Sequence, residues 1–387
     1  MHLVFERDLA VPPAAAWPLL TDPGLMNRWS TARVTSLAPG DGGGPGGVGA
    51  LRAIALGSGA RGLTFEEVIE EAEAPHRLAY RVVAGLPIRR HRGLVTLDAR
   101  GGGAHLRWSV ELDFPAPGME LLARRLLAPQ LDASLDALAR VAVETPAASL
   151  PAPPPQRRID ESGELPALYA AAEACAARQR ALADELAADP KRWFPRVYQF
   201  VTELQIEGCR RGDFTHPGWV LRLVPAFHAY FESNLARARQ AAPGLEAHWR
   251  SSFRAMDQAA RWFRRDELRA IFYGVAKGMQ AHIEEDLPRA LAETYARHYA
   301  GRCDYARFRA DYLRMSGVFR AAGQRLGAEV PDRLLPLRAR LLRAVLPAEA
   351  GDWLLNRSFY DLPRERRKAF ERGERIAALL TAAPGRA

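Results

Sequence analysis

The sequence predicts two domains of different fold class: an α+β domain in which a curved antiparallel sheet surrounds a long C-terminal helix, and an all-α domain after it. Three observations predict this division. Alternating apolar and polar residues, typical of strands, are confined to the chain up to Phe114. A long amphipathic helical pattern follows directly, at residues 117–143. Beyond a Pro-rich stretch, only helical patterns occur.

Size and composition agree with two soluble domains. The 387 residues exceed the size, about 250–300 residues, at which a single hydrophobic core stops growing. Hydrophobic residues make up 48% and charged residues 26% of the chain, as in soluble globular proteins. No apolar run reaches the roughly 18 residues of a membrane span, and the first residues lack the pattern of a secretory signal. We therefore expect a cytoplasmic protein without a membrane span.

The charge and cysteine patterns exclude two further classes. The formal net charge is +9, but residues 1–150 hold 15 basic and 16 acidic side chains, so the excess lies later in the chain. There the basic residues are mixed with acidic ones, as in residues 364–368, which is typical of solvated helix faces. We expect no nucleic-acid partner. Cys175, Cys209 and Cys303 lack the close spacing of a zinc or redox motif, and no disulfide framework is expected.

The first domain begins with a strand at residues 3–11, which Pro12 and Pro13 end. A short helix at residues 14–20 follows, and Asp22 and Pro23 are positioned to start a second. Gly-rich turns then separate six strands, expected at residues 33–37, 48–56, 63–71, 77–83, 91–97 and 105–114. Leucines along one side of residues 117–143 predict the long helix.

This order of elements, with three phrases of sequence, resembles the helix-grip superfamily that includes START-related lipid-transfer domains, the birch pollen allergen, and the polyketide cyclase/dehydrase and lipid-transport proteins. The phrases are Trp17-Pro18-Leu19-Leu20-Thr21-Asp22-Pro23, Leu78-Ala79-Tyr80-Arg81-Val82 and Gly103-Ala104-His105-Leu106-Arg107-Trp108. The resemblance covers about residues 1–145. It implies a cavity between sheet and helix that binds a hydrophobic or amphipathic small molecule, lipid or polyketide-like.

Six residues are candidates for the lining of such a cavity. A ligand cavity is mostly apolar, with a few polar groups that fix orientation. The expected lining residues are the aromatic Trp29, Tyr80 and Trp108 and the polar Arg52, Arg90 and His91. The alternative is that the aromatic residues are ordinary core.

Residues 146–159 form a Pro-rich linker, and residues 160–387 form the helical domain. Its helices are expected at residues 165–188, 194–208, 219–241, 248–264, 266–287, 288–299, 304–326, 332–346, 347–357 and 363–380. The helix at 332–346 is basic and amphipathic. Such a helix packs on its own domain or lies on an anionic membrane surface, so peripheral membrane contact is one hypothesis for it.

The helical domain carries a second, more specific resemblance. Residues 278–288 include the phrase Ala281-His282-Ile283, two further residues, and Asp286-Leu287-Pro288. With the aromatic series before it, this stretch resembles a bacterial all-helical family of unknown function whose hallmark is Ala-His-Ile-x-x-Asp-Leu-Pro. The resemblance covers about residues 190–300, and Glu284 stands where the family commonly has Asn. Pro288 is expected to end or kink the helix.

Pairs of polar residues at helical spacing suggest a site in this domain. His282 and Asp286 lie four residues apart, as do His228 and Glu232, so each pair leaves one face of its helix. Convergence of these four residues would create a divalent metal site with mixed nitrogen and oxygen ligands, suited to Zn, Mn or Fe. Glu203 and Glu207 can add further carboxylates.

The same residues allow other interpretations. His282 and Asp286 can form a catalytic pair, or only an intrahelical clamp. His216, His248 and His298 are expected in turns or on helix surfaces. The leading functional hypothesis is binding of a hydrophobic or amphipathic small molecule by the first domain, with an accessory helical domain. The alternatives are a metal-assisted hydrolase or oxidase in the helical domain, and an interaction protein with neither activity.

Overall fold

The computed structural model describes residues 1–57, 62–86, 88–115, 118–145, 150, 159–187, 189–262, 267–329 and 362–382. The chain divides into two compact units. The first unit contains Met1–Ile159 and Gly301–Ala310, and the helical unit contains Asp160–Ala300 and Asp311–Ala387. None of the helices in the described ranges combines the length and the apolarity needed to cross a membrane.

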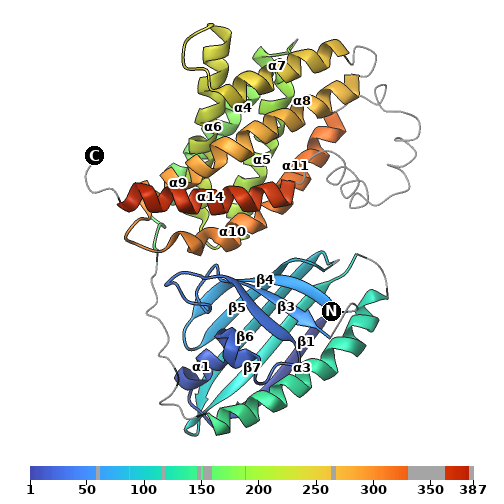
Figure 1. Cartoon of the computed structure of the whole chain (residues 1–387), viewed down its shortest axis with the longest axis vertical. Helices are drawn as coiled ribbons and strands as arrows, with labels where there is room; N and C mark the ends of the chain where they lie inside the picture. The colour runs from blue at the N-terminus through green and yellow to red at the C-terminus, as the bar shows by residue number, and fades with distance from the viewer. Residues whose placement is uncertain are drawn as a thin grey trace. The chain divides into compact units, whose positions relative to one another are not determined.

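The first unit is built on a seven-stranded antiparallel sheet (Figure 1). The strand order is β1-β7-β6-β5-β4-β3-β2, a meander whose last strand returns beside the first. The strands are β1 (His2–Leu9), β2 (Arg33–Ala38), β3 (Leu51–Leu56), β4 (Leu63–Glu73), β5 (Arg77–Ala84), β6 (Arg90–Arg100) and β7 (Gly103–Asp113). The predicted fold class is confirmed: a curved sheet with one long helix, followed by a helical unit.

Three helices accompany this sheet. They are α1 (Pro13–Thr21), α2 (Pro23–Met26) and α3 (Met119–Glu144). The Asp22 carboxylate caps α2 by accepting a hydrogen bond from the Leu25 amide at 3.0 Å. Leu135 and Leu138 of α3 are fully buried and share one core with Trp17 of α1 and Leu106 of β7. This core holds α1 and the C-terminal half of α3 against the concave face of the sheet.

The N-terminal half of α3 packs much less closely. None of the residues 119–133 is buried. Leu121, Leu122 and Leu126 are 64%, 61% and 57% exposed, in contrast to the sealed second half of the helix. Pro129 lies between the two halves and removes one backbone hydrogen bond there. The concave face of the sheet is therefore closed tightly at one end of the helix only.

A short segment from later in the chain, Gly301–Ala310, belongs to the first unit. It contains the 3-10 helix η5 (Tyr305–Phe308). Asp41, in the Gly-rich loop after β2, accepts hydrogen bonds from the Asp304 amide at 2.8 Å and from the Arg307 guanidinium at 2.6 Å. Arg309 donates to the carbonyl oxygen of Gly49 at 2.6 Å. The Gly-rich loop is thus a binding surface for residues 301–310.

Gly49 allows the closest approach in this loop. Its φ is +82°, and a Cβ placed on it would lie 1.8 Å from the Ala306 carbonyl oxygen. Only glycine combines this backbone conformation with such a contact.

The helical unit consists, over its described residues, of helices without strands (Figure 1). These are α4 (Leu165–Glu185), the 3-10 helix η3 (Pro190–Arg192), α5 (Trp193–Arg210), α6 (Pro217–Arg239), α7 (Ala247–Trp262), α8 (Glu267–Ala281), the π-helical turn η4 (His282–Asp286), α9 (Leu287–His298), α11 (Ser316–Glu329) and α14 (Leu362–Ala382). The helix α10 (Arg309–Arg314) starts in the first unit and ends in the helical unit. The single helix predicted at 304–326 is wrong, because η5, α10 and α11 replace it. The helices predicted at 332–346 and 347–357 lie outside the described residues.

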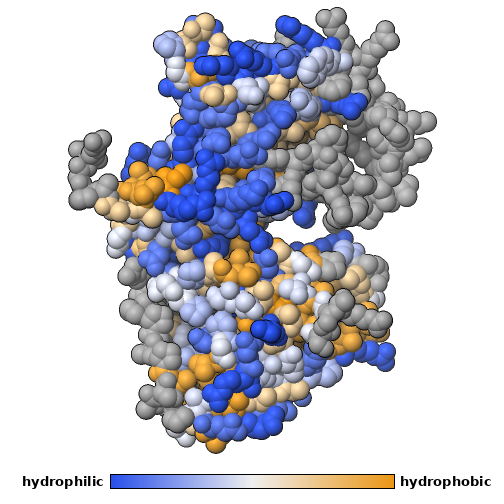
Figure 2. Space-filling model, viewed as in Figure 1, coloured by the Kyte–Doolittle hydropathy of each residue, from blue (hydrophilic) through white to orange (hydrophobic). Residues whose placement is uncertain are grey.

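Aromatic side chains form the centre of the helical unit. Phe194 of α5 packs on Phe231 of α6 and on Trp249 of α7, with ring centroids 4.7 and 5.3 Å away. Gly278 of α8 makes room for it, because a Cβ there would lie 2.4 Å from the Phe194 ring. On the face shown in Figure 2, hydrophilic residues cover much of this unit, while apolar residues reach the surface of the first unit in several places.

Candidate functional site

The phrase singled out in the sequence forms a π-helical turn, η4 (His282–Asp286), between α8 and α9. The Leu287 amide donates to the His282 carbonyl oxygen, five residues back, where an α-helix would use the residue four back. Pro288 follows at the second position of α9 and has no N–H to donate. The break expected at Pro288 therefore takes the form of one widened turn in a helix that continues to His298.

Arginine side chains donate hydrogen bonds to two carbonyl groups of this turn. The Glu284 carbonyl, which an N–H at position 288 would otherwise bond, accepts from the Arg372 guanidinium of α14 at 2.6 Å. The Glu285 carbonyl accepts from Arg289 Nε at 3.2 Å. The turn is thereby stabilised by partners from outside its own backbone ladder.

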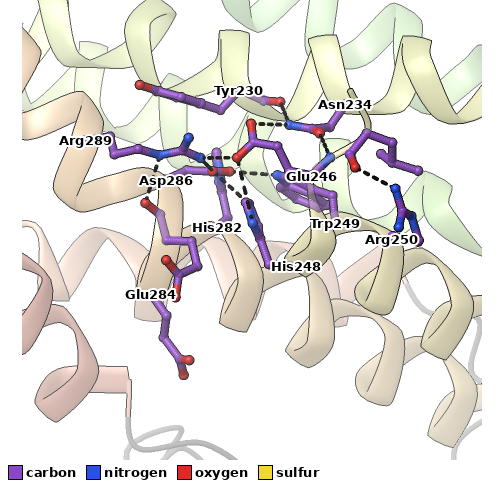
Figure 3. Close-up of polar contacts among 12 residues, drawn as sticks. Tyr230, Asn234, Glu246, His248, Trp249, Arg250, His282, Glu284, Asp286 and Arg289 are labelled. Carbon is purple, nitrogen blue, oxygen red and sulfur yellow. Dashed lines mark hydrogen bonds and ion pairs between the residues drawn. The ribbon is translucent and has the colours of Figure 1, made fainter. Parts of the chain in front are cut away.

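Asp286 is the centre of a buried polar network (Figure 3). Its side chain is 0% exposed. Oδ2 accepts from His282 Nδ1 at 2.7 Å and from Trp249 Nε1 at 2.8 Å. Oδ1 accepts from His248 Nε2 at 3.0 Å and from the Arg289 guanidinium at 2.5 Å. Four donors from three elements thus satisfy the buried carboxylate.

The network fixes the charge of its members. Burial alone would raise the pKa of Asp286, but hydrogen bonds from His248 and His282 outweigh burial and lower this pKa below its usual range. Burial lowers the pKa of His282 despite the neighbouring carboxylate. His282 is therefore a neutral imidazole that donates from Nδ1 to an ionised Asp286.

Aromatic rings enclose His282. Its ring stacks on Phe227 with centroids 3.5 Å apart and an angle of 5° between planes. Phe194, Tyr198 and Trp249 surround it at 5.0–5.6 Å. The residue is 1% exposed. This arrangement suits an internal clamp better than a catalytic base, because a base must reach the proton that it abstracts.

One group of side chains in the described residues has the spacing of metal ligands. One ligand atom each from Glu246, His248 and Asp286 lies within 4.8 Å of the other two. Arg289 already lies among them, 2.8 Å from Glu246 and 2.5 Å from Asp286. Its guanidinium supplies the positive charge that a divalent ion would bring. With Arg289 in place, the donor set does not fit a metal ion.

The other predicted ligands lie in separate pairs. His228 Nε2 is 3.7 Å from Glu232 Oε2, and Glu232 is held by Arg178 Nε at 2.6 Å. Glu203 accepts from Arg180, and Glu207 from Arg325. Thus the structure joins His282 to Asp286 and places His228 beside Glu232, and it surrounds Asp286 with residues that the sequence did not indicate.

Two histidines expected at surfaces or in turns have structural partners. His216 lies in the turn before α6, as expected, but it is 6% exposed and its ring lies 3.1 Å from the Asp311 carboxylate. His248 contacts Asp286, as described above. Arg289 could have been found from the sequence, since it follows Asp286 by three residues on the same helical face. His248 and Trp249 come from α7, and only tertiary packing reveals them.

The first unit brings five predicted ligand residues into one contact network on its concave face. The Trp29 and Trp108 rings pack edge to face with centroids 6.4 Å apart. Trp108 Nε1 donates to the Tyr80 hydroxyl at 2.9 Å. The Tyr80 ring in turn lies 5.6 Å from the His91 ring and 5.5 Å from the Arg52 guanidinium carbon. Arg90, the sixth predicted residue, is exposed.

Gly93 of β6 allows Tyr80 to reach Trp108 across the sheet. Tyr80 pairs with Gly93 in the β5–β6 register, and β6 separates Tyr80 from β7. A Cβ on Gly93 would lie 2.2 Å from the Tyr80 ring. Without that side chain the ring extends over β6, and its hydroxyl meets Trp108 on β7.

Arg52 and Glu67 form a buried ion pair beside Tyr80. Arg52 Nε donates to Glu67 at 2.6 Å, and the two side chains are 3% and 6% exposed. Arg52 also donates to the Leu20 carbonyl at 3.5 Å, which places it on the side of the sheet that faces α1. Burial raises the pKa of Glu67 in spite of this partner. The pair places two charges on a largely apolar face of the sheet. Burying either charge without the other would cost much free energy, so the two side chains depend on each other.

His91 replaces a backbone partner where β5 and β6 separate. The ladder between these strands runs from Arg77 to Tyr80. Beyond it, the Val82 amide donates to His91 Nδ1 at 3.2 Å. Nδ1 is therefore an acceptor, and the proton of the neutral ring is on Nε2. Burial, assisted by the nearby Arg81, lowers the pKa of His91 to about 4, while Glu70 opposes the change.

The pKa of His91 predicts acid sensitivity of the first unit. Because the folded value is about 4 against 6.5 in the reference state, the unfolded chain binds the proton more readily between these values. The stabilisation is complete above pH 6.5 and is lost as the pH falls towards 4. Between pH 7 and about 4.5 we expect a loss of about 2–3 kcal/mol from this residue. Urea unfolding of wild type and His91→Asn at both pH values measures it.

The asparagine variant provides the control. Its amide oxygen can accept from Val82 without titrating, so its stability should fall less with pH than that of wild type. Equal pH dependence of the two proteins would show that another group is responsible.

Comparison with known proteins gives a separate match for each part of the chain. Residues 172–387 match the model of a family of unknown function, DUF5995. Residues 2–143 match the model described as polyketide cyclase/dehydrase and lipid transport. Both resemblances drawn from the sequence are confirmed. The second match supports, at a coarse level, the binding of a hydrophobic small molecule by the first unit. No curated protein matches the chain.

Solved structures also resemble part of the chain. A crystal structure of a Thermus thermophilus protein shares 17% identity, covers 38% of this chain and 99% of its own, and gives a TM-score of 0.31. A solution structure from Thermobifida fusca shares 23% identity over 37% of this chain and 93% of its own, with a TM-score of 0.31. Norcoclaurine synthase from Thalictrum flavum, in complex with dopamine and hydroxybenzaldehyde, shares 15% identity over 38% and 88%, with a TM-score of 0.31.

Proposed function

Since the chain belongs to the family of unknown function DUF5995, we propose its function from the geometry of its own residues: the first unit binds an amphipathic small molecule on the concave face of its sheet. The apolar part of the ligand packs between the sheet and the loosely packed N-terminal half of α3. An oxygen atom of the ligand accepts hydrogen bonds from Tyr80 and His91. Lipids with a hydroxyl or carbonyl group and polyketide-like compounds have this chemistry.

The proposal is carried by two hydrogen-bond donors on buried residues, Tyr80 and His91, each 7% exposed. The Tyr80 hydroxyl accepts from Trp108, and its own proton has no acceptor among the described residues. His91 uses Nδ1 to accept from Val82, and its Nε2 proton likewise has no acceptor in the described part of the chain. Burial raises the pKa of Tyr80, so the hydroxyl keeps its proton. The two rings lie 5.6 Å apart, close enough for one ligand oxygen or two neighbouring ones.

The exposed leucines of α3 support the same proposal. A ligand of this kind needs an opening in the apolar interior, and residues 119–133 leave one end of the concave face loosely closed. Arg52 and Glu67 form an ion pair with each other, so we give them a structural role in the wall of the binding site and no hydrogen bond to the ligand. Trp29 and Trp108 supply apolar surface beside the donors.

Probe binding to the full chain tests the proposal. Wild type is expected to bind both diphenylhexatriene, a hydrocarbon without oxygen, and a pyrene-labelled long-chain alcohol. Tyr80→Phe removes the donor and should weaken alcohol binding by about 2- to 10-fold, the value of one hydrogen bond. It should leave hydrocarbon binding within about twofold. Fluorescence titration measures both.

The exposed Arg90 provides a matched control, since Arg90→Ala should bind both probes like wild type. A wild-type protein that binds neither probe would refute ligand binding on this face. Equal loss of both probes in Tyr80→Phe would instead assign Tyr80 to packing.

A further inference from the structure

A small cavity lies in the helical unit, and two of the residues that line it carry buried polar atoms without a partner in the described part of the chain. Its volume is about 20 Å³. Gln179 of α4 and His228 of α6 both line it, and they are 1% and 7% exposed. Gln179 Oε1 and His228 Nε2 have no hydrogen-bond partner among the described residues. The rest of the wall is mixed: apolar side chains such as Val224, Phe227 and Phe319 alternate with residues that carry polar groups, namely Tyr198, Thr202, Gln205, Tyr312 and Arg366.

Neighbouring charges leave His228 available to the cavity. Glu232 Oε2 is 3.7 Å from His228 Nε2, too far for a hydrogen bond, and Arg178 holds the Glu232 carboxylate at 2.6 Å. Burial lowers the pKa of His228 to about 4, so its ring is neutral near pH 7. The amide oxygen of Gln179 accepts a hydrogen bond, and the neutral ring nitrogen of His228 donates or accepts one according to its tautomer. A neutral molecule that can both donate and accept hydrogen bonds suits the two atoms in either case.

The cost of leaving two buried polar atoms without hydrogen bonds favours a bound molecule in this cavity. A buried polar atom without a partner destabilises a fold substantially, and two around one cavity add to each other. The cavity volume of about 20 Å³ gives room for one or two water molecules, since about 10–15 Å³ is enough for one.

We propose that the helical unit contains a binding site for a water molecule, held between Gln179 Oε1 and His228 Nε2. The site is independent of the ligand proposed for the first unit, and of the Asp286 network. Phe227 separates it from His282, because the Phe227 ring lines the cavity and stacks on the imidazole.

The direction in which Gln179→Met shifts the thermal midpoint of unfolding tests whether a water molecule is bound. Gln179→Met keeps approximately the shape of the side chain and removes its amide. If a water molecule bridges the two atoms, the variant deprives that water and His228 of a partner, and the thermal midpoint falls by about 2–4 °C. If the cavity is dry, the variant removes an uncompensated polar atom, and the midpoint rises. A rise would overturn the proposal.

Two further variants separate the site from packing. Leu223→Met changes an apolar wall residue of the same cavity and is expected to shift the midpoint less than Gln179→Met. With His228→Phe already in place, Gln179→Met should cost less than it does alone, because the two groups share one partner. Additive losses would contradict a shared molecule.

A crystal structure of the full chain provides the direct observation. Ordered solvent density within about 3 Å of both atoms is the expected result. Gln179 and His228 paired with protein groups, or no density between them, would refute the site even if the variants failed to fold.

Discussion

Replacing Asp286 with asparagine is expected to lower the free energy of unfolding of the helical unit by about 3–5 kcal/mol. The substitution keeps the size of the side chain and removes the charge that Arg289 faces. It also turns an amide N–H₂ towards groups that donate, since His248, His282 and Trp249 all point hydrogen atoms at the two oxygens. A half-buried guanidinium, paired only with Glu246, and an unpaired buried donor would remain. Urea denaturation followed by tryptophan fluorescence measures the loss.

Glu285 is the matched control for this experiment. It lies in the same π-helical turn, but it is 43% exposed, and its partner Arg372 is 45% exposed. Glu285→Gln is therefore expected to cost less than about 1 kcal/mol. If Asp286→Asn had no more effect than Glu285→Gln while abolishing a binding or catalytic activity, the network would be functional and the clamp interpretation would be wrong.

Replacing Gly49 with alanine is expected to destabilise the first unit by about 2–5 kcal/mol. The new Cβ would collide with the Ala306 carbonyl oxygen, which is backbone and has little freedom to move. The φ of +82° adds a further penalty of about 1–2 kcal/mol for any residue with a Cβ. Release of residues 301–310 from the loop would relieve the collision. Hydrogen exchange of the Asp304 amide, which donates to Asp41, reports that release.

Gly43, in the same loop, separates the two penalties. Its φ is +72°, and a Cβ on it would meet nothing within 4 Å. Gly43→Ala should therefore show the cost of the backbone conformation alone, about 1–2 kcal/mol, without faster exchange at Asp304. Equal effects of the two variants would mean that the contact with Ala306 contributes nothing.

Local periodicity explains what could be predicted from the sequence. Alternation placed the strands of the first unit, and i,i+4 spacing placed His282 beside Asp286, because both patterns depend on backbone geometry within one element. The same rule could have corrected one prediction. Arg90 and His91 are neighbours in β6, so their side chains leave opposite faces of the sheet, and only His91 is on the concave side.

The remaining parts of both sites depend on distant pairing. Glu67 meets Arg52 through the register of β3 and β4, which no single-strand pattern reveals. His248 and Trp249 meet Asp286 because α7 packs beside the π-helical turn. The predicted metal site of His228, Glu232, His282 and Asp286 likewise depended on α6 packing so that Glu232 met Asp286. Glu232 instead pairs with Arg178.

The inclusion of residues 301–310 in the first unit makes that unit discontinuous in sequence. A fragment cut in the Pro-rich linker would contain every strand of the sheet but would omit Arg307 and Arg309. Asp41 and the carbonyl oxygen of Gly49 would then lose their charged partners. A fragment that represents the first unit must therefore include this ten-residue segment, and one that represents the helical unit must omit it. A single cleavage site cannot divide the protein into its two compact units.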